Sequence, residues 1–307
     1  MLTDIALSHD ETLRRLDDGE RAAEHAVLAA VDAHFAGFKG SLRAAYDAMT
    51  AATPIADDVS LERIDADGVQ GWWVRPAGAR ADRVMLFVHG GAFMLGSAEA
   101  YRGFASQIAT RTRIDTFVLD YPLAPEHPFP AAYDATIAAL AWLAKSGTRD
   151  IALAGDSAGG GLVLAALGHD VELASRVTCV AAFSPWVDLA LAGASFLDEQ
   201  TYDPIFKPVM LSNAASAYLG SHDARDRRAS PLYAIPERLP PILFQVGSDE
   251  LLIDDARRYA HAAAQRGTPV QLDIFEGLHH VFQRSTVELP SARFALDRLA
   301  AFVEQHG

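Results

Sequence analysis

One serine of this sequence stands among glycines, in a spacing that suits a nucleophile. The run Gly-Asp-Ser-Ala-Gly-Gly-Gly covers residues 155–161 and directly follows the apolar residues 151–154. Ser157 has Gly155 two positions before it and Gly159 two positions after it. This G-x-S-x-G pattern, between a strand and a helix, is typical of a nucleophile elbow, because only small neighbours fit around a serine held in a strained turn. The alternative is a glycine turn whose serine has no chemical role.

Other polar groups follow further apolar runs, each at the point where a strand is predicted to end. His89, Gly90 and Gly91 follow residues 84–88, Asp249 comes shortly after residues 242–246, and His280 lies beyond residues 270–275. An α/β sheet places its chemistry at the carboxyl ends of its strands, so these groups should meet at one edge. The chain order serine, aspartate, histidine is the order of α/β-hydrolases.

Each of these residue types has a role in acyl transfer. A serine hydroxyl is a poor nucleophile near pH 7, so Ser157 needs a histidine base, which would be His280. The carboxylate of Asp249 would hold the imidazole in one tautomer and balance its charge. The oxyanion would be stabilised by backbone amides. The amides predicted for this task are those of Gly90, Gly91 and Ala158.

The composition of the chain indicates its size class and the kinds of molecule that it can bind. The chain has 307 residues, half of them hydrophobic, which is enough for a substantial core in one large α/β domain or two small ones. A formal charge of −14 argues against nucleic acid or an anionic membrane as a partner and favours a neutral small molecule. Cys179 is the only cysteine, so no intramolecular disulfide can form.

The sequence lacks the motifs of secreted, membrane, metal-dependent and nucleotide-binding proteins. The start of the chain lacks the basic and apolar segments of a signal peptide, and no run has the length of a membrane span, so we expect a cytoplasmic protein. There is no H-E-x-x-H, no G-K-[ST] phosphate loop and no G-x-G-x-x-G fingerprint. We therefore expect no metal, cofactor or nucleotide.

The elements that position these residues can be predicted from periodicity. Apolar residues recur at helical spacing from about residue 10 to 35, and Ser41 is the expected N-cap of a second helix that ends before Pro54. Residues 59–65 and 69–75 read as a hairpin. Strands and helices then alternate, which predicts a mostly parallel sheet covered by helices on both faces. The predicted strands are residues 84–88, 116–119, 151–154, 177–183, 242–246 and 270–275, and the predicted helices are 101–110, 131–145, 160–167, 254–266 and 291–305.

One interval interrupts this alternation. Almost sixty residues separate the strand ending near Phe183 from the strand starting near Ile242, and residues 204–219 have a helical pattern. We interpret the interval as an insertion over the carboxyl edge of the sheet. The predicted organisation is a pair of cap helices in residues 1–55 and a catalytic domain in residues 56–307, with a second cap segment at about 190–225.

Six blocks occur in a fixed order along the chain. They are HGGAF at residues 89–93, YPLAPEHPFPAA at 121–132, GDSAGG at 155–160, SPWVDL at 184–189, GSDELLIDDA at 247–256 and GLHHVF at 277–282. Together they resemble the bacterial hormone-sensitive-lipase family (family IV) of carboxylesterases, from about residue 60 onward. The resemblance implies an α/β-hydrolase fold with a helical cap, no cofactor, and hydrolysis of short to medium acyl esters. By family analogy we expect a homodimer, with residues 270–275 as an edge-strand contact.

The resemblance also decides between neighbouring residues. The family pattern G-x-x-H-x-F selects His280 rather than His279 as the base. It selects Asp249 as the acid among the neighbouring carboxylates Glu250, Asp254 and Asp255, because only Asp249 occupies the aspartate position of the family. Asp254 and Asp255 are expected to begin the next helix, where carboxylates are favoured. The third glycine of the family is Ala92 here, and Pro122 replaces a common arginine. Four residues are assigned structural roles rather than catalysis: Glu126, His127, Trp186 and Asp188.

The sequence thus predicts a serine esterase that forms an acyl-enzyme. The alternatives on the same site are a lactone hydrolase and an amide or formamide hydrolase, since the acyl-transfer machinery is shared. A non-catalytic small-molecule receptor is the alternative from another class, since fold alone does not establish activity. The residues predicted to line the substrate pocket are Phe35, Phe38, Met94, Phe206, Met210 and Leu211.

Overall fold

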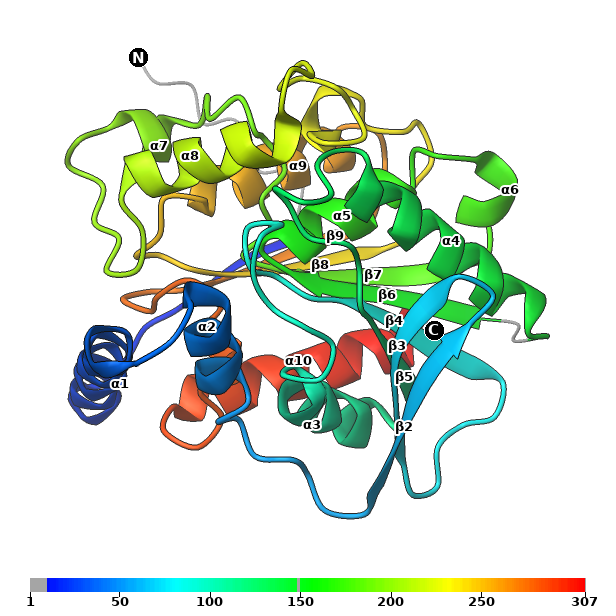
Figure 1. Ribbon diagram of the computed structural model, residues 1–307, viewed down its shortest axis with the longest axis horizontal. Helices are drawn as coiled ribbons and strands as arrows, with labels where there is room; N and C mark the ends of the chain where they lie inside the picture. The colour runs from blue at the N-terminus through cyan, green and yellow to red at the C-terminus, as the bar shows by residue number, and fades with distance from the viewer. Residues whose placement is uncertain (1–9, 148–149, 307) are drawn as a thin grey trace.

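The computed structural model describes residues 10–147 and 150–306, and its centre is a single mixed sheet (Figure 1). Within these residues the strand order is β1-β9-β8-β7-β6-β4-β5-β3-β2. The strands are β1 Asp10–Arg14, β2 Val59–Ala66, β3 Val69–Pro76, β4 Arg83–Val88, β5 Asp115–Leu119, β6 Asp150–Asp156, β7 Val177–Phe183, β8 Ile242–Gly247 and β9 Val270–Phe275. The six strands predicted beyond the hairpin are all present.

Most neighbouring strands are parallel, as the alternation of elements predicts. The exceptions among the described strands are the hairpin of β2 with β3 and the pairing of β3 with β5, which are antiparallel. The central strands β4, β6 and β8 are almost entirely buried, because helices cover both of their faces. The predicted α/β class, a mostly parallel sheet with flanking helices, is confirmed.

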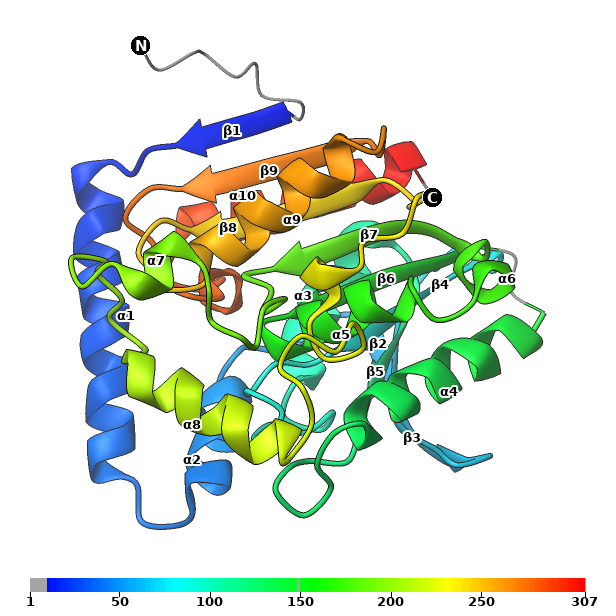
Figure 2. The same ribbon diagram turned by 90° about the horizontal axis from the view of Figure 1, so that it is seen from above.

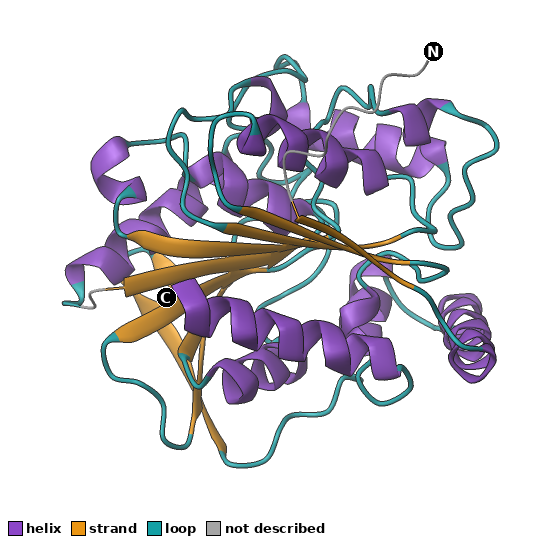
Figure 3. Cartoon of the chain, turned by 180° about the vertical axis from the view of Figure 1, so that it is seen from behind, coloured by secondary structure: helices purple, strands orange, loops and turns teal. Residues whose placement is uncertain are grey.

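Two layers of helices enclose this sheet (Figure 3). One face packs against α3 and α10, and the other packs against α4, α5 and α9. The described helices are α1 Asp18–Gly37, α2 Leu42–Thr50, α3 Arg102–Thr112, α4 Ala131–Lys145, α5 Ala158–Ala166, α6 Val171–Ala174, α7 Ala194–Leu197, α8 Pro208–Leu219, α9 Ile253–Ala264 and α10 Pro290–His306, with short 3₁₀ turns η1 Pro231–Tyr233 and η2 Phe282–Arg284.

The start of the described chain differs from the prediction. Residues 10–14 were expected to belong to a helix, but they form β1, which pairs in parallel with β9. The first helix begins only at Asp18, where the side chain of Asp17 accepts a hydrogen bond from the Glu20 amide at 2.8 Å. The prediction that β9 is an edge strand is therefore wrong. Pairing through backbone groups needs no apolar pattern, so the polar sequence of β1 conceals it.

Helices α1, α2, α7 and α8 gather beyond the carboxyl ends of the strands, whereas the short α6 lies at the other end, before β7 (Figure 2). Helices α1 and α2 come from the start of the chain, and α7 and α8 from the long interval between β7 and β8. Ser41 caps α2 as predicted, accepting from the Ala44 amide at 3.2 Å. The predicted cap of residues 1–55 includes residues 1–9, which lie outside the described residues. Among the residues that the structure describes, no helix has both the length and the hydropathy of a membrane span.

Candidate active site

Ser157 lies at the junction of β6 and α5 in a strained backbone conformation. Its φ and ψ angles are 51° and −119°, a combination that side chains with a Cβ rarely adopt. Its amide donates to the Phe183 carbonyl at 2.8 Å, which ties the junction to the end of β7. A Cβ added to Gly155 would lie 2.6 Å from the Gly159 backbone, so the small flanking residues are a steric requirement. The junction therefore has the geometry of the predicted elbow.

His280 lies in the loop after β9, and its carboxylate partner is Glu250. Nδ1 of His280 is 2.5 Å from Oε2 of Glu250, and both side chains are buried. The carboxylate of Asp249 instead accepts from the Ser248 hydroxyl at 2.7 Å. The prediction that Asp249 is the acid partner is wrong by one residue. After β8 the chain turns so that Glu250 is fully buried against the imidazole, whereas Asp249 is only half-buried.

A second serine holds this pair in place. The Ser184 hydroxyl, directly after β7, donates to Oε1 of Glu250 at 3.0 Å. Oγ of Ser184 in turn accepts from the amide of Val281, next to His280, at 3.1 Å. Ser184 thus connects the acid, the histidine loop and the strand end to which the Ser157 amide is bonded. Sequence reasoning missed this role, although Ser184 begins the block SPWVDL.

Burial controls the protonation of the pair. It lowers the pKa of His280, against the opposing carboxylates of Asp203 and Asp156, so the imidazole is neutral near pH 7. Burial also raises the pKa of Glu250, and the Ser184 hydroxyl opposes that shift. Nε2 of His280 has no hydrogen-bond partner among residues 10–147 and 150–306. An unpaired Nε2 on a neutral imidazole is the acceptor that a general base needs, and catalytic hydrogen bonds are often absent without substrate.

The neighbouring histidine is engaged elsewhere. Nδ1 of His279 is 2.7 Å from Oε1 of Glu24, and the His279 amide donates to the same oxygen at 3.0 Å. Glu24 is a buried residue of α1, so this contact anchors α1 to the loop that contains His279 and His280. His279 therefore has a structural role here, in agreement with the selection of His280.

The loop after β4 departs from the prediction at one of its amides. The Gly90 amide donates to Oδ1 of the buried Asp156 at 2.8 Å, so Gly90 is not available as an oxyanion donor and that prediction is wrong. Gly91 adopts a φ of 112°, and any side chain there would collide with the Leu95 carbonyl. The His89 ring stacks on Tyr121, with ring centres 4.3 Å apart, and supports the loop. Gly91 and Ala158 remain the candidate donors.

The predicted pocket residues lie in different environments. The Phe206 ring packs edge-on against His280, with ring centres 5.0 Å apart. Phe35 and Phe38 flank His34 at the end of α1 and are half-buried, as is Met94. Met210 is 49% exposed, whereas Leu211 is 1% exposed and packs in the main core. Only Phe206 is placed against the histidine by a described contact, and Leu211 does not face open space.

A cavity of about 380 Å³ lies between α1, α2 and the loop of residues 279–288. Val27 and Val31 of α1, Met49 of α2, and Arg284 are among its walls. Neither Ser157 nor His280 lines it, and none of the six predicted pocket residues does.

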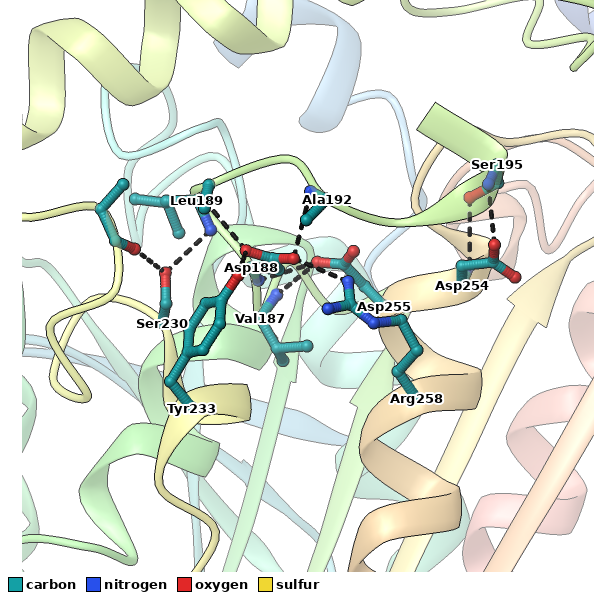
Figure 4. Close-up of polar contacts among 12 residues, drawn as sticks. Val187, Asp188, Leu189, Ala192, Ser195, Ser230, Tyr233, Asp254, Asp255 and Arg258 are labelled. Carbon is teal, nitrogen blue, oxygen red and sulfur yellow. Dashed lines mark hydrogen bonds and ion pairs between the residues drawn. The ribbon is translucent and has the colours of Figure 1, made fainter. Parts of the chain in front are cut away.

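The loop after β7 is braced by buried carboxylates, as Figure 4 shows. Asp188 accepts from the Tyr233 hydroxyl at 2.9 Å and from the Arg258 guanidinium at 2.6 Å. Asp255, in the first turn of α9, accepts from the amides of Val187 and Asp188 at 2.8 and 2.9 Å. The prediction of a structural role for Asp188 is confirmed. The brace joins the loop beside the elbow to the helix that follows Glu250.

No group of three or more histidine, cysteine or acidic side chains within residues 10–147 and 150–306 could hold a metal ion. What the structure brings together is a strained serine, a neutral histidine with a free nitrogen, and a buried carboxylate. These groups suit nucleophilic acyl transfer.

Comparisons with known proteins agree with this chemistry. A family model described as an alpha/beta hydrolase fold matches residues 85–284. An acetyl-hydrolase of Streptomyces hygroscopicus is 38% identical over 75% of this chain and 78% of its own length. An esterase of Acinetobacter venetianus is 34% identical over 85% of this chain and 88% of its own.

A solved structure extends the likeness to three dimensions. The crystal structure of an esterase from the bacterial hormone-sensitive lipase family matches with a TM-score of 0.86 and 36% identity, over 93% of this chain and 98% of that one. The family resemblance of the sequence is confirmed. The chain belongs to the bacterial hormone-sensitive-lipase family of the alpha/beta hydrolases and is a carboxylic ester hydrolase.

Proposed function

We propose that the protein is a serine carboxylesterase that hydrolyses short to medium acyl esters through Ser157, His280 and Glu250. The observation that carries the proposal is the buried pair of His280 and Glu250. It leaves Nε2 of His280 unpaired, at the same edge of the sheet as the elbow that holds Ser157. The name of the acetyl-hydrolase relative supports a small acyl group.

The first half of the proposed reaction forms an acyl-enzyme. The Ser157 oxygen attacks the ester carbonyl while Nε2 of His280 takes the hydroxyl proton. Glu250 stabilises the imidazolium that results, and the amides of Gly91 and Ala158 stabilise the oxyanion. As the tetrahedral intermediate collapses, His280 returns the proton to the leaving alkoxide, and an alcohol departs.

The second half releases the acid. Water attacks the acyl carbonyl and gives a proton to Nε2 of His280. The same two amides stabilise the second oxyanion. His280 then returns the proton to the Ser157 oxygen as the acyl bond breaks, which restores the free enzyme and leaves the carboxylic acid as product.

The test combines covalent labelling with a substrate screen. A fluorophosphonate probe is expected to label the wild-type protein but not Ser157→Ala, and that variant is expected to lose at least about 10³-fold in kcat. Esters, lactones and anilides of matched acyl group are compared in parallel, with short-chain esters expected to react fastest. Full esterase activity in Ser157→Ala would overturn the proposal, and a preference for lactones or anilides would replace its substrate class.

A further inference from the structure

We propose that cap helix α2 positions the oxyanion loop, residues 89–97 after β4, through Asp156 and the side chains of Arg43, Tyr46 and Asp47. This inference rests on the proposed function, because it concerns the same oxyanion site. It assigns to α2 a fixed supporting role in catalysis.

Asp156 is a buried carboxylate that the proposed reaction does not use. It is the residue before Ser157, and its two oxygens have different partners. Oδ1 accepts from the Gly90 amide at 2.8 Å, and Oδ2 accepts from the Tyr101 hydroxyl at 2.9 Å. One side chain therefore joins the nucleophile elbow to the first amide of the oxyanion loop, immediately before Gly91.

A line of hydroxyl groups extends from Asp156 into α2. The hydroxyls of Tyr46 and Tyr101 are 2.9 Å apart. Tyr101 has a single hydroxyl proton, which it donates to Asp156, so Tyr46 must donate to Tyr101. Arg284 in turn donates to the Tyr46 oxygen at 3.2 Å. The line thus has one consistent direction, from Arg284 through α2 to the carboxylate.

Two further side chains of α2 hold the turn that begins at Gly91. Nε of Arg43 donates to the Met94 carbonyl at 2.8 Å. The Ser97 hydroxyl donates to Asp47 at 3.1 Å. Within the turn, the amides of Met94 and Leu95 donate to the Gly91 carbonyl at 3.0 and 2.9 Å. Helix α2 therefore contacts the turn at Met94 and Ser97, and the turn contains the candidate donor Gly91.

Arg43 is itself held by the neighbouring loop. Its Nη2 donates to the Ala124 carbonyl at 2.8 Å and its Nη1 to Glu126 at 2.9 Å. The structural role predicted for Glu126 is thereby confirmed. The guanidinium connects three segments, so the position of α2 determines the position of the turn.

The expected consequence is selective for the transition state. An oxyanion donor acts on charge that develops during the reaction, so a misplaced Gly91 lowers kcat more than it raises KM. Removing one donor from such a site costs about 10²- to 10³-fold in kcat. A weakened support should cost less than the complete loss of the donor.

The first test compares two substitutions of Asp156. Asp156→Ala removes both acceptors and is expected to lower kcat about 100-fold with little change in KM. Asp156→Asn keeps an oxygen that can accept from Gly90 and is expected to recover most of that loss. A purely structural role would not separate the two variants by kcat at equal melting temperature.

The second test acts on the cap alone. Tyr46→Phe removes only the hydroxyl on α2 and is expected to lower kcat about three- to tenfold, since the donor shifts without being lost. The matched control is Tyr133→Phe on α4, because the hydroxyl of Tyr133 is 3.0 Å from Nδ1 of His169 and, among the described residues, makes no hydrogen bond with α2. The control is expected to keep the wild-type kcat. Tyr46→Phe keeps the inference testable if Asp156→Ala does not fold.

The deciding readout compares two ligands. A trifluoromethyl ketone forms a tetrahedral adduct on Ser157, whereas the carboxylic acid product forms none. In Asp156→Ala and Tyr46→Phe, affinity for the ketone should fall in parallel with kcat/KM while affinity for the acid stays unchanged. An unchanged kcat in both variants, or equal losses for both ligands, would overturn the inference. Such a result would not affect the proposed function as long as Ser157→Ala is inactive. An active Ser157→Ala would instead overturn the proposed function itself.

Discussion

Glu250 and Asp249 are adjacent carboxylates in very different surroundings. Glu250 is fully buried between Ser184 and His280, whereas Asp249 is half-buried and contacts only the hydroxyl of Ser248 among the hydrogen bonds of the described side chains. An acid that orients a catalytic imidazole has to be desolvated and fixed in place. Of the two side chains, only Glu250 meets this requirement.

Exchanging each carboxylate for its amide tests the assignment. Glu250→Gln is expected to lower kcat by about 10³- to 10⁴-fold, because the imidazole loses its tautomer and its countercharge. Asp249→Asn, the matched control next to it, is expected to stay within about threefold of the wild type. Steady-state kinetics on a short-chain ester measures both. A severe loss in Asp249→Asn together with an active Glu250→Gln would restore the aspartate as the acid.

The pH profile follows from the burial of His280. Because burial lowers the pKa of this imidazole, it stays neutral below its usual pKa near 6.5. The proposed base must be neutral to accept the serine proton, so kcat/KM should persist below pH 6.5 and fall only as the pH drops through the lowered value. Measuring kcat/KM from pH 4 to 8 checks this, and an acid limb centred above pH 6.5 would contradict it.

Helix α1 depends on buried carboxylates rather than on a broad apolar face. Glu20 accepts from the Ser291 amide, and Glu24 accepts two hydrogen bonds from His279. Both glutamates are at most 5% exposed. Buried charged acceptors tolerate little displacement, because a lost partner leaves a desolvated group unpaired. These hydrogen bonds therefore hold α1 in a fixed position against the loop that contains His280.

Substituting Glu24 tests this anchor. Glu24→Ala leaves two donors of His279 without their acceptor, so the free energy of unfolding is expected to fall by about 2–3 kcal/mol. Asp32→Ala, an exposed position of the same helix, is the matched control and should stay within about 0.5 kcal/mol of the wild type. Urea unfolding followed by circular dichroism measures both. Equal stability of the two variants would show that the Glu24 contact does not anchor the helix.

The whole molecule carries a formal charge of −14, and the proposed reaction uses no cationic side chain to bind the acid or alcohol group. A field of that sign repels an anionic substrate over distances longer than a contact. Neutral esters should therefore reach the site faster than anionic esters of the same size.

Two matched esters test this effect. The kcat/KM for 4-nitrophenyl hemisuccinate is expected to be at least about threefold lower than for 4-nitrophenyl butyrate at low ionic strength. The difference should shrink at 0.5 M salt, because the Debye length is then only about 4 Å. A ratio that does not change with salt would assign the preference to local contacts instead.

The sequence alone determined the architecture and two members of the site. Strands β2 to β9 and the elbow at Ser157 are predicted because their signals are local: apolar runs of strand length, and glycines two residues to either side of a serine. His280 follows from its place after the last predicted strand, together with the family pattern. Each of these features depends on only a few residues that are neighbours in the sequence, so it can be recognised without knowing the tertiary structure.

Only the tertiary structure decided which carboxylate faces His280, which amide of the oxyanion loop is occupied, and that residues 10–14 form an edge strand. Glu250 is selected by Ser184, Gly90 is occupied by Asp156, and β1 is held by β9, all partners distant in sequence. A hydrogen bond is directional and satisfied by whichever group packing brings near. The type and spacing of residues along the chain do not show toward which group a given side chain or amide points in the folded protein.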